Sequence, residues 1–80
     1  MLILDQTKQL IVNLDNVSFI FIEKKTNSIK AMLTGIGSDA QRMHLGTYQS
    51  FEDCKKVLGE IACAHTMMSI YKMPLGGEVN

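Results

Sequence analysis

The segment VSFIFIEK at residues 17–24 constrains the fold most strongly, because it is rich in the β-branched and aromatic residues that favour β-strands. In a strand, Val17, Phe19 and Phe21 point to one face, while two isoleucines point to the other. Both faces of this strand are therefore partly apolar. This pattern is typical of a central strand that is covered on both sides.

Three further strands are predicted around this segment. Residues 2–4 and 10–14 are short apolar runs separated by the polar sequence DQTKQ, a pattern that indicates a first hairpin. Residues 28–36 follow the polar turn KKTN and alternate between an apolar face and a mixed face. We expect this strand to be half-buried and to pair antiparallel with residues 17–24.

A last strand is predicted at residues 41–48, with Met43 and Leu45 facing inward and the only arginine of the chain facing outward. Together with nearby polar side chains, this arginine could bind a phosphate-bearing small molecule. The residues of this candidate ligand site are Arg42, His44, Tyr48 and Lys30. The alternative is an ordinary solvated strand face.

A helix follows the strands. Ser50 is the predicted N-cap, because its hydroxyl can accept a hydrogen bond from the backbone of Asp53, and acidic residues in the first turn favour the positive end of a helix. We expect the helix to run from Phe51 to about Lys72, since Pro74 cannot continue it.

The predicted fold class is therefore α+β. An antiparallel sheet of four to five strands, arranged as hairpins or a meander, is followed by one long C-terminal α-helix that packs on the sheet. A chain of 80 residues forms one domain, which we assign to residues 1–74, with residues 75–80 as a flexible C-terminal tail.

The second half of the predicted helix contains the uncharged sequence IACAHTMMSIY at residues 61–71. At about 100° per residue, His65 and Met68 fall on the stripe that faces the sheet, whereas Cys63 and Met67 fall on the opposite side. The helix becomes apolar nearly all round, and such a helix must be buried on every side. We expect His65 and Met68 to belong to the core of the domain.

Little in this chain could cover the opposite side of the helix, so we predict a homo-oligomer, either a dimer or a larger assembly. The predicted interface residues are Cys63, Met67, Ile70 and Tyr71. A foreign protein partner is the main alternative. A third arrangement is a helix that frays after Ser69 and folds Met67 onto its own tail.

Catalytic and metal-binding patterns are weak. Cys63 and His65 are about 200° apart on a helix and cannot share one metal ion. Cys54 and Cys63 are separated by about 13 Å along the helix axis, too far for a disulfide. We predict no metal, no cofactor and no enzymatic activity. Reduced thiols and the absence of a signal peptide favour a cytoplasmic protein.

Charge further restricts the partners. Lys plus Arg number eight and Asp plus Glu also number eight, so no net charge attracts nucleic acid or an anionic membrane. No apolar run approaches the roughly 20 residues of a membrane span. We therefore expect neither membrane nor nucleic-acid binding, and we keep a host protein and a small nucleotide as candidate partners.

Five short motifs carry a resemblance. They are N-x-D-N-V at 13–17, L-G-x-Y at 45–48, S-x-E at 50–52, V-L-x-E-I at 57–61 and Y-x-M-P at 71–74. In this pattern the chain resembles a family of short, largely uncharacterised proteins encoded by phages and prophages of Firmicutes bacteria. The resemblance implies a compact sheet with a C-terminal helix and a phage setting. The chain departs from the family pattern in a longer loop at 34–42 and an unusually apolar late helix.

The phage setting implies a function, because many small phage proteins inhibit host defence. We expect a non-enzymatic anti-defence protein in the cytoplasm of the infected host. It would block either a defence protein or a nucleotide-derived immune signal, the latter held between subunits. The alternative is a structural or regulatory phage module, such as an assembly chaperone or a modulator of transcription, that acts by protein–protein contact.

Overall fold

The computed structural model describes residues 1–33, 42–67 and 69–79. It confirms the α+β class. In chain order, the strands and the helix of the described residues are β1 (Leu2–Leu4), β2 (Ile11–Asn13), β3 (Val17–Glu23), β4 (Ser28–Leu33), β5 (Arg42–Thr47), α1 (Phe51–Ala64) and β6 (Ile70–Lys72). Short 3-10 turns occupy Leu14–Asn16 and Gly76–Glu78.

The strands form two three-stranded sheets, so the prediction of one antiparallel sheet of four to five strands is wrong. One sheet has the order β2-β1-β6, in which β1 pairs antiparallel with β2 and parallel with β6. The other has the order β3-β4-β5 and is antiparallel throughout. Both predicted hairpins are confirmed. The prediction that β3 is a central strand is wrong. β4 is the central strand, and among the described residues no strand pairs with the other side of β3.

The helix begins at Phe51 as predicted, with the Ser50 hydroxyl accepting a hydrogen bond from the Asp53 backbone N–H at 3.1 Å. It ends at Ala64, so the predicted extension to Lys72 is wrong. The chain turns over the next residues and returns as β6. On either side of β6, the Ser69 carbonyl accepts a hydrogen bond from the Leu2 backbone N–H, and the Met73 backbone N–H donates to the Leu4 carbonyl.

Strand pairing explains this early end. Ile70 and Tyr71 favour strands, Pro74 disfavours helical geometry at Met73, and β1 offers an unpaired edge on the side away from β2. Tertiary pairing therefore overrides helix propensity. One consequence is that His65 is exposed, so its predicted place in the core is wrong. Met68, the other residue predicted there, lies outside the described residues.

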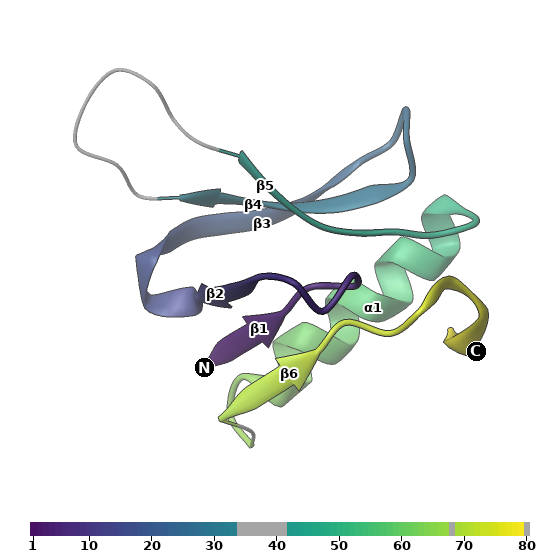
Figure 1. Ribbon diagram of the computed structural model, residues 1–80. Coiled ribbons are helices and arrows are strands. Elements are labelled where there is room, and N and C mark those ends of the chain that lie inside the picture. Colours follow the sequence, from purple (N-terminus) through teal and green to yellow (C-terminus); the bar gives the residue numbers. More distant parts are fainter. Residues whose placement is uncertain (34–41, 68, 80) are drawn as a thin grey trace.

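The core lies between the two sheets and α1. In Figure 1 the β3-β4-β5 sheet lies above β1, β2 and β6, and α1 runs alongside β6. The inner faces of both sheets and one side of α1 supply the buried side chains. They are Ile3, Val12, Ile29, Ala31, Leu45, Tyr48, Cys54, Val57, Ile61, Ala64, Tyr71 and Met73. The apolar face predicted for residues 28–36 is buried at Ile29 and Ala31. Of the two inward residues predicted for β5, Leu45 is buried and Met43 is partly buried.

Gln6 connects the two sheets. Its backbone N–H donates to the Leu45 carbonyl at 2.8 Å. Its side-chain amide donates to the carbonyls of Thr47 and Pro74 and accepts from the Thr47 backbone N–H. The turn between β1 and β2 is therefore attached both to β5 and to the C-terminal segment. In that segment Val79 packs against the core, while the flexibility of residues 75–80 stays a prediction.

Candidate functional site

Two surfaces contain the residues that the sequence singled out. The first is the solvent side of the β3-β4-β5 sheet. Strand register places Lys30 opposite His44 and Phe21, and Met32 opposite Arg42 and Phe19. Because directly opposed residues share a face, these side chains form one surface. This outer sheet face consists of Phe19, Phe21, Lys30, Met32, Arg42 and His44.

Aromatic and cationic groups are in contact on this face. The rings of Phe19 and Phe21 have centroids 5.7 Å apart and are tilted by 53°, and the Arg42 guanidinium lies 5.7 Å from the centre of the Phe21 ring. Phe19 is 54% exposed although it is a large apolar residue. Aromatic residues and arginine are both enriched in the cores of protein interfaces, and this face carries both.

The other polar groups of the face have partners within the chain. The Lys30 ammonium lies 2.6 Å from a carboxylate oxygen of Glu23, and this hydrogen bond and charge lower the pKa of the Glu23 carboxyl. The His44 ring nitrogen Nε2 lies 3.0 Å from the hydroxyl of Thr47. The face therefore carries its positive charge chiefly at Arg42.

Tyr48 is not brought to this face. Its side chain is 4% exposed and points into the core, where its hydroxyl donates to the Pro74 carbonyl at 2.8 Å. Burial raises the pKa of this hydroxyl above its ordinary value. Of the four predicted ligand-binding residues, the structure thus gathers Lys30, Arg42 and His44 and separates Tyr48 from them.

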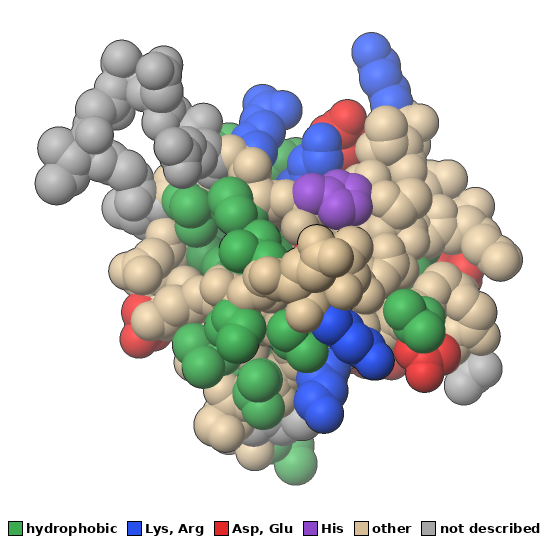
Figure 2. Space-filling view, in the orientation of Figure 1, with side chains coloured by type: hydrophobic (Ala, Val, Ile, Leu, Met, Phe, Trp, Pro, Cys, Tyr) green, Lys and Arg blue, Asp and Glu red, His purple; other side chains and the backbone are tan. Residues whose placement is uncertain are grey.

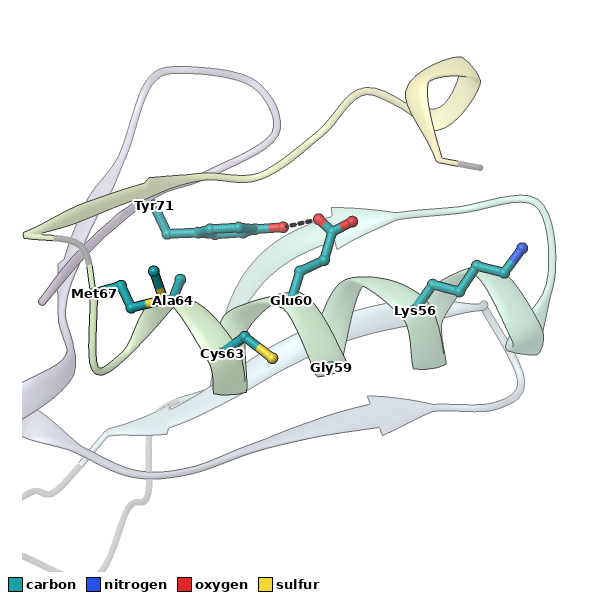
Figure 3. Close-up of a pocket in the computed structure, with 7 residues that line it drawn as sticks. All are labelled: Lys56, Gly59, Glu60, Cys63, Ala64, Met67 and Tyr71. Carbon is teal, nitrogen blue, oxygen red and sulfur yellow. Dashed lines mark hydrogen bonds between the residues drawn. The ribbon is translucent and has the colours of Figure 1, made fainter.

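The second surface is a groove beside α1 with a volume of about 750 Å³. This α1 groove is lined by Lys56, Gly59, Glu60, Cys63, Ala64, Met67 and Tyr71 (Figure 3). It brings together three of the four predicted interface residues. Ile70 is the fourth, and it lies outside the groove, because β6 directs neighbouring side chains to opposite faces.

Met67 and Tyr71 define the groove. Met67 is 84% exposed, the highest value among the large apolar side chains of the described residues. Tyr71 is buried, and its hydroxyl donates to a carboxylate oxygen of Glu60 at 2.7 Å, which fixes the ring above the helix (Figure 3). Burial and this hydrogen bond raise the pKa of the Tyr71 hydroxyl.

The thiols differ in environment. Cys54 is buried and burial raises its pKa, whereas Cys63 is exposed in the α1 groove, and both are free thiols. Residues 1–33, 42–67 and 69–79 contain no group of three or more His, Cys, Asp and Glu side chains arranged to hold a metal ion. Among the described residues no helix has the length and apolar character needed to cross a membrane.

Several residues of these surfaces were not predicted. The strand alternation already placed Phe19 and Phe21 on one face, but nothing in the sequence showed that this face is open to solvent. Lys56 and Gly59 fall on the side of the predicted helix that the sequence marks as an ordinary solvated face, and Glu60 was not singled out. They line a groove because β6 returns beside α1, which the helical interpretation of residues 65–72 excluded.

Comparison of the chain with protein-family models, with curated proteins and with solved structures finds no match.

Proposed function

We propose that the protein is a non-enzymatic binding protein that blocks a host defence protein during phage infection, and that the outer sheet face is its contact surface. The phage setting rests on the resemblance of the five sequence motifs. The binding surface rests on one observation, which is the 54% exposure of Phe19 against Phe21. Burying such an aromatic side chain against a partner contributes about 1.5–3 kcal/mol to the free energy of binding.

The composition of the face supports a protein partner. Phenylalanine, methionine and arginine are enriched in interface cores, and the residues that dominate binding energy are often aromatic or arginine. Here Arg42 lies opposite Met32 in the sheet and its guanidinium lies over the Phe21 ring, which is in contact with Phe19. β3 also lies at a sheet edge, so a partner can approach Phe19 from the side as well as from above.

Capture of a nucleotide-derived signal is less well supported. Small ligands favour enclosed pockets with convergent polar groups, and three hollows among the described residues are lined without Lys30, Arg42 or His44. The carboxylate of Glu23 beside Lys30 would repel a phosphate. Tyr48 is buried and engaged by Pro74. These contacts favour a protein over a nucleotide.

Phage plating tests the proposal. The wild-type protein, Phe19→Glu and Ile11→Glu are each expressed in hosts with and without defence systems. Ile11 is the matched control, because it is 56% exposed on the other sheet. We expect wild type and Ile11→Glu to restore plating on a defended host and Phe19→Glu to lose at least about tenfold of the effect.

Other results would change the proposed function or its contact surface. Failure of the wild-type protein to restore plating on any defended host would favour the structural or regulatory module. If Phe19→Glu restores phage plating as fully as the wild-type protein, the outer sheet face is not the contact surface. A pull-down with the wild-type protein identifies the partner by mass spectrometry, and calorimetry with cyclic nucleotides and ADP-ribose derivatives tests the nucleotide alternative directly.

A further inference from the structure

The side of β3 that faces away from β4 borders an apolar hollow. Among the described residues, no strand pairs with this side. The hollow has a volume of about 490 Å³, and its lining includes Phe19 and Ile20 of β3 and Leu58 and Ala62 of α1. Phe19 lies on the outer face of the sheet, whereas Ile20 lies opposite the buried Ala31 and is on the inner face. Because side chains from both faces of β3 line it, the hollow lies along the edge of this strand.

The other edge of this sheet is partly covered by the chain itself. Beside β5, the Gln6 backbone N–H donates to the Leu45 carbonyl, and the Gln6 side-chain amide exchanges two hydrogen bonds with the Thr47 backbone. Gln6 therefore takes the place of a neighbouring strand at β5. Within the described ranges, the edge of β3 has no neighbouring strand. An extended chain is the occupant whose N–H and C=O groups match such an edge.

The sequence of β3 suits a neighbour on both sides. Apolar side chains occupy both of its faces, with Phe19 and Phe21 outward and Ile20 and Ile22 inward. This pattern is typical of a central strand, whereas natural edge strands often carry charges or proline that prevent further pairing. Residues 19–22 contain neither. The register shift of β3 lies before Phe19, so the rest of the strand is regular and can accept a neighbour.

Charge favours an acidic neighbour. Residues 17–47, which include the three strands of this sheet, contain four Lys and Arg against two Asp and Glu, whereas the rest of the neutral chain contains four against six. In Figure 2, Lys and Arg side chains gather along the top of the molecule, over this sheet. Glu23 is bound by Lys30, while the Arg42 guanidinium lies over the Phe21 ring and forms no ion pair within the described residues. A carboxylate placed beside Phe21 can pair with this guanidinium.

We propose that an extended acidic segment of the partner protein pairs with the edge of β3 over residues 19–23. Neighbouring side chains of a strand point to opposite faces. The partner residue opposite Phe21 therefore points outward, toward Arg42, and the one opposite Ile20 points into the hollow beside α1. The segment recognised has an apolar residue next to an Asp or Glu. The inference rests on the proposed function, because it names the chemistry of the partner that binds the outer sheet face.

A peptide selection tests this chemistry without a defended host. Random peptides of about 12 residues are selected on the immobilised wild-type protein, and the affinity of synthetic copies is measured by fluorescence anisotropy. We expect the selected peptides to share an apolar residue next to Asp or Glu. Arg42→Met removes the guanidinium and Ala62→Glu places a charge in the hollow, so each should weaken binding at least about tenfold. Gly59→Glu is the matched control, because it adds the same charge to α1 outside the hollow and should leave the affinity unchanged.

Backbone methylation tests the strand pairing itself. Each amide nitrogen of the tightest-binding peptide is methylated in turn. Because hydrogen-bonding groups alternate along a strand, every second methyl group along the paired residues should weaken binding at least about tenfold, while the methyl groups between them have little effect. A methylation profile without this alternation overturns the strand pairing.

Other outcomes also overturn the inference. They are a selection that yields no binder, selected peptides without an acidic residue, and an affinity that resists either Arg42→Met or Ala62→Glu. A wild-type dimer in light scattering that Ala62→Glu dissociates would assign the edge to a second copy instead. Circular dichroism shows whether each variant is folded. Phage plating is a separate readout, so peptides that bind as expected while the wild-type protein restores no plating would refute the phage role and not this site.

Discussion

The contact between Gly46 and Tyr48 leads to a prediction that can be worked out from distances. A β-carbon added at Gly46 would lie 2.9 Å from the Tyr48 hydroxyl oxygen and 3.1 and 3.2 Å from two of its ring carbons. The ring cannot easily move away, because it is buried and its hydroxyl is bonded to the Pro74 carbonyl. Gly46→Ala therefore forces either a displaced ring or a broken hydrogen bond.

The expected cost follows from these contacts. Overpacking a tight site costs about 1–3 kcal/mol, and the loss of glycine flexibility in the unfolded chain returns about 0.5–1 kcal/mol. We expect Gly46→Ala to lower the free energy of unfolding by about 1–2 kcal/mol. Tyr48→Phe removes one hydrogen bond and costs about 1 kcal/mol, because the Pro74 carbonyl keeps its bond from the Gln6 amide.

The double variant provides the sharpest measurement. A phenylalanine at position 48 lacks the nearest atom and is no longer tied to Pro74, so the combined cost is expected to fall below the sum of the single costs by about 1 kcal/mol. Urea unfolding is followed by circular dichroism at one fixed protein concentration. Gly77→Ala is the control, because nothing lies within 4 Å of its added β-carbon. An unchanged stability of Gly46→Ala, or strict additivity, would refute the reasoning.

Three more predictions concern local structure. Ser50→Ala removes the N-cap bond to Asp53 and is expected to cost about 1 kcal/mol in urea unfolding, whereas Ser50→Asn retains most of it. Asp5 accepts from the Thr7 hydroxyl and two backbone N–H groups, which lower its pKa, so its contribution is present above pH 3.8 and is lost as pH falls through the folded-state pKa. The stability gap between wild type and Asp5→Asn should therefore shrink from pH 7 to pH 3. Gln6→Leu removes three side-chain hydrogen bonds, two to Thr47 and one to Pro74, and is expected to lower the melting temperature by about 4–8 °C for each kcal/mol lost.

The local parts of the fold could be predicted from the sequence, and the long-range parts could not. Alternation identified β4 and β5 and their buried sides, and the Ser50 cap located the start of α1. β6 was missed because its residues also suit the apolar side of a helix. Only the unpaired edge of β1 decides between the two, and that edge is separated from β6 by most of the chain.

The candidate surfaces could be predicted only in part, because they too depend on both local patterns and long-range pairing. Alternation alone placed Arg42 and His44 outward, and the apolar late segment drew attention to Cys63 and Met67, which line the α1 groove. Tyr48 was placed with the outward residues because regular alternation puts Arg42, His44 and Tyr48 on one face. The pairing of β4 with β5 shifts register between Ile29 and Lys30, so Gly46 lies opposite the buried Ile29 and Tyr48 follows it into the core.

The motifs that carry the family resemblance contact one another and stabilise the fold. Gly46 lies under Tyr48, which bonds to Pro74, and Tyr71 bonds to Glu60. These contacts join L-G-x-Y to Y-x-M-P and Y-x-M-P to V-L-x-E-I, while S-x-E and N-x-D-N-V supply the helix cap and a bond within the turn after β2. The residues of the outer sheet face, which are proposed to contact a partner, lie outside these motifs. A protein that shares the motifs is therefore expected to share this fold, and its partner is set by the side chains that the motifs leave free to vary.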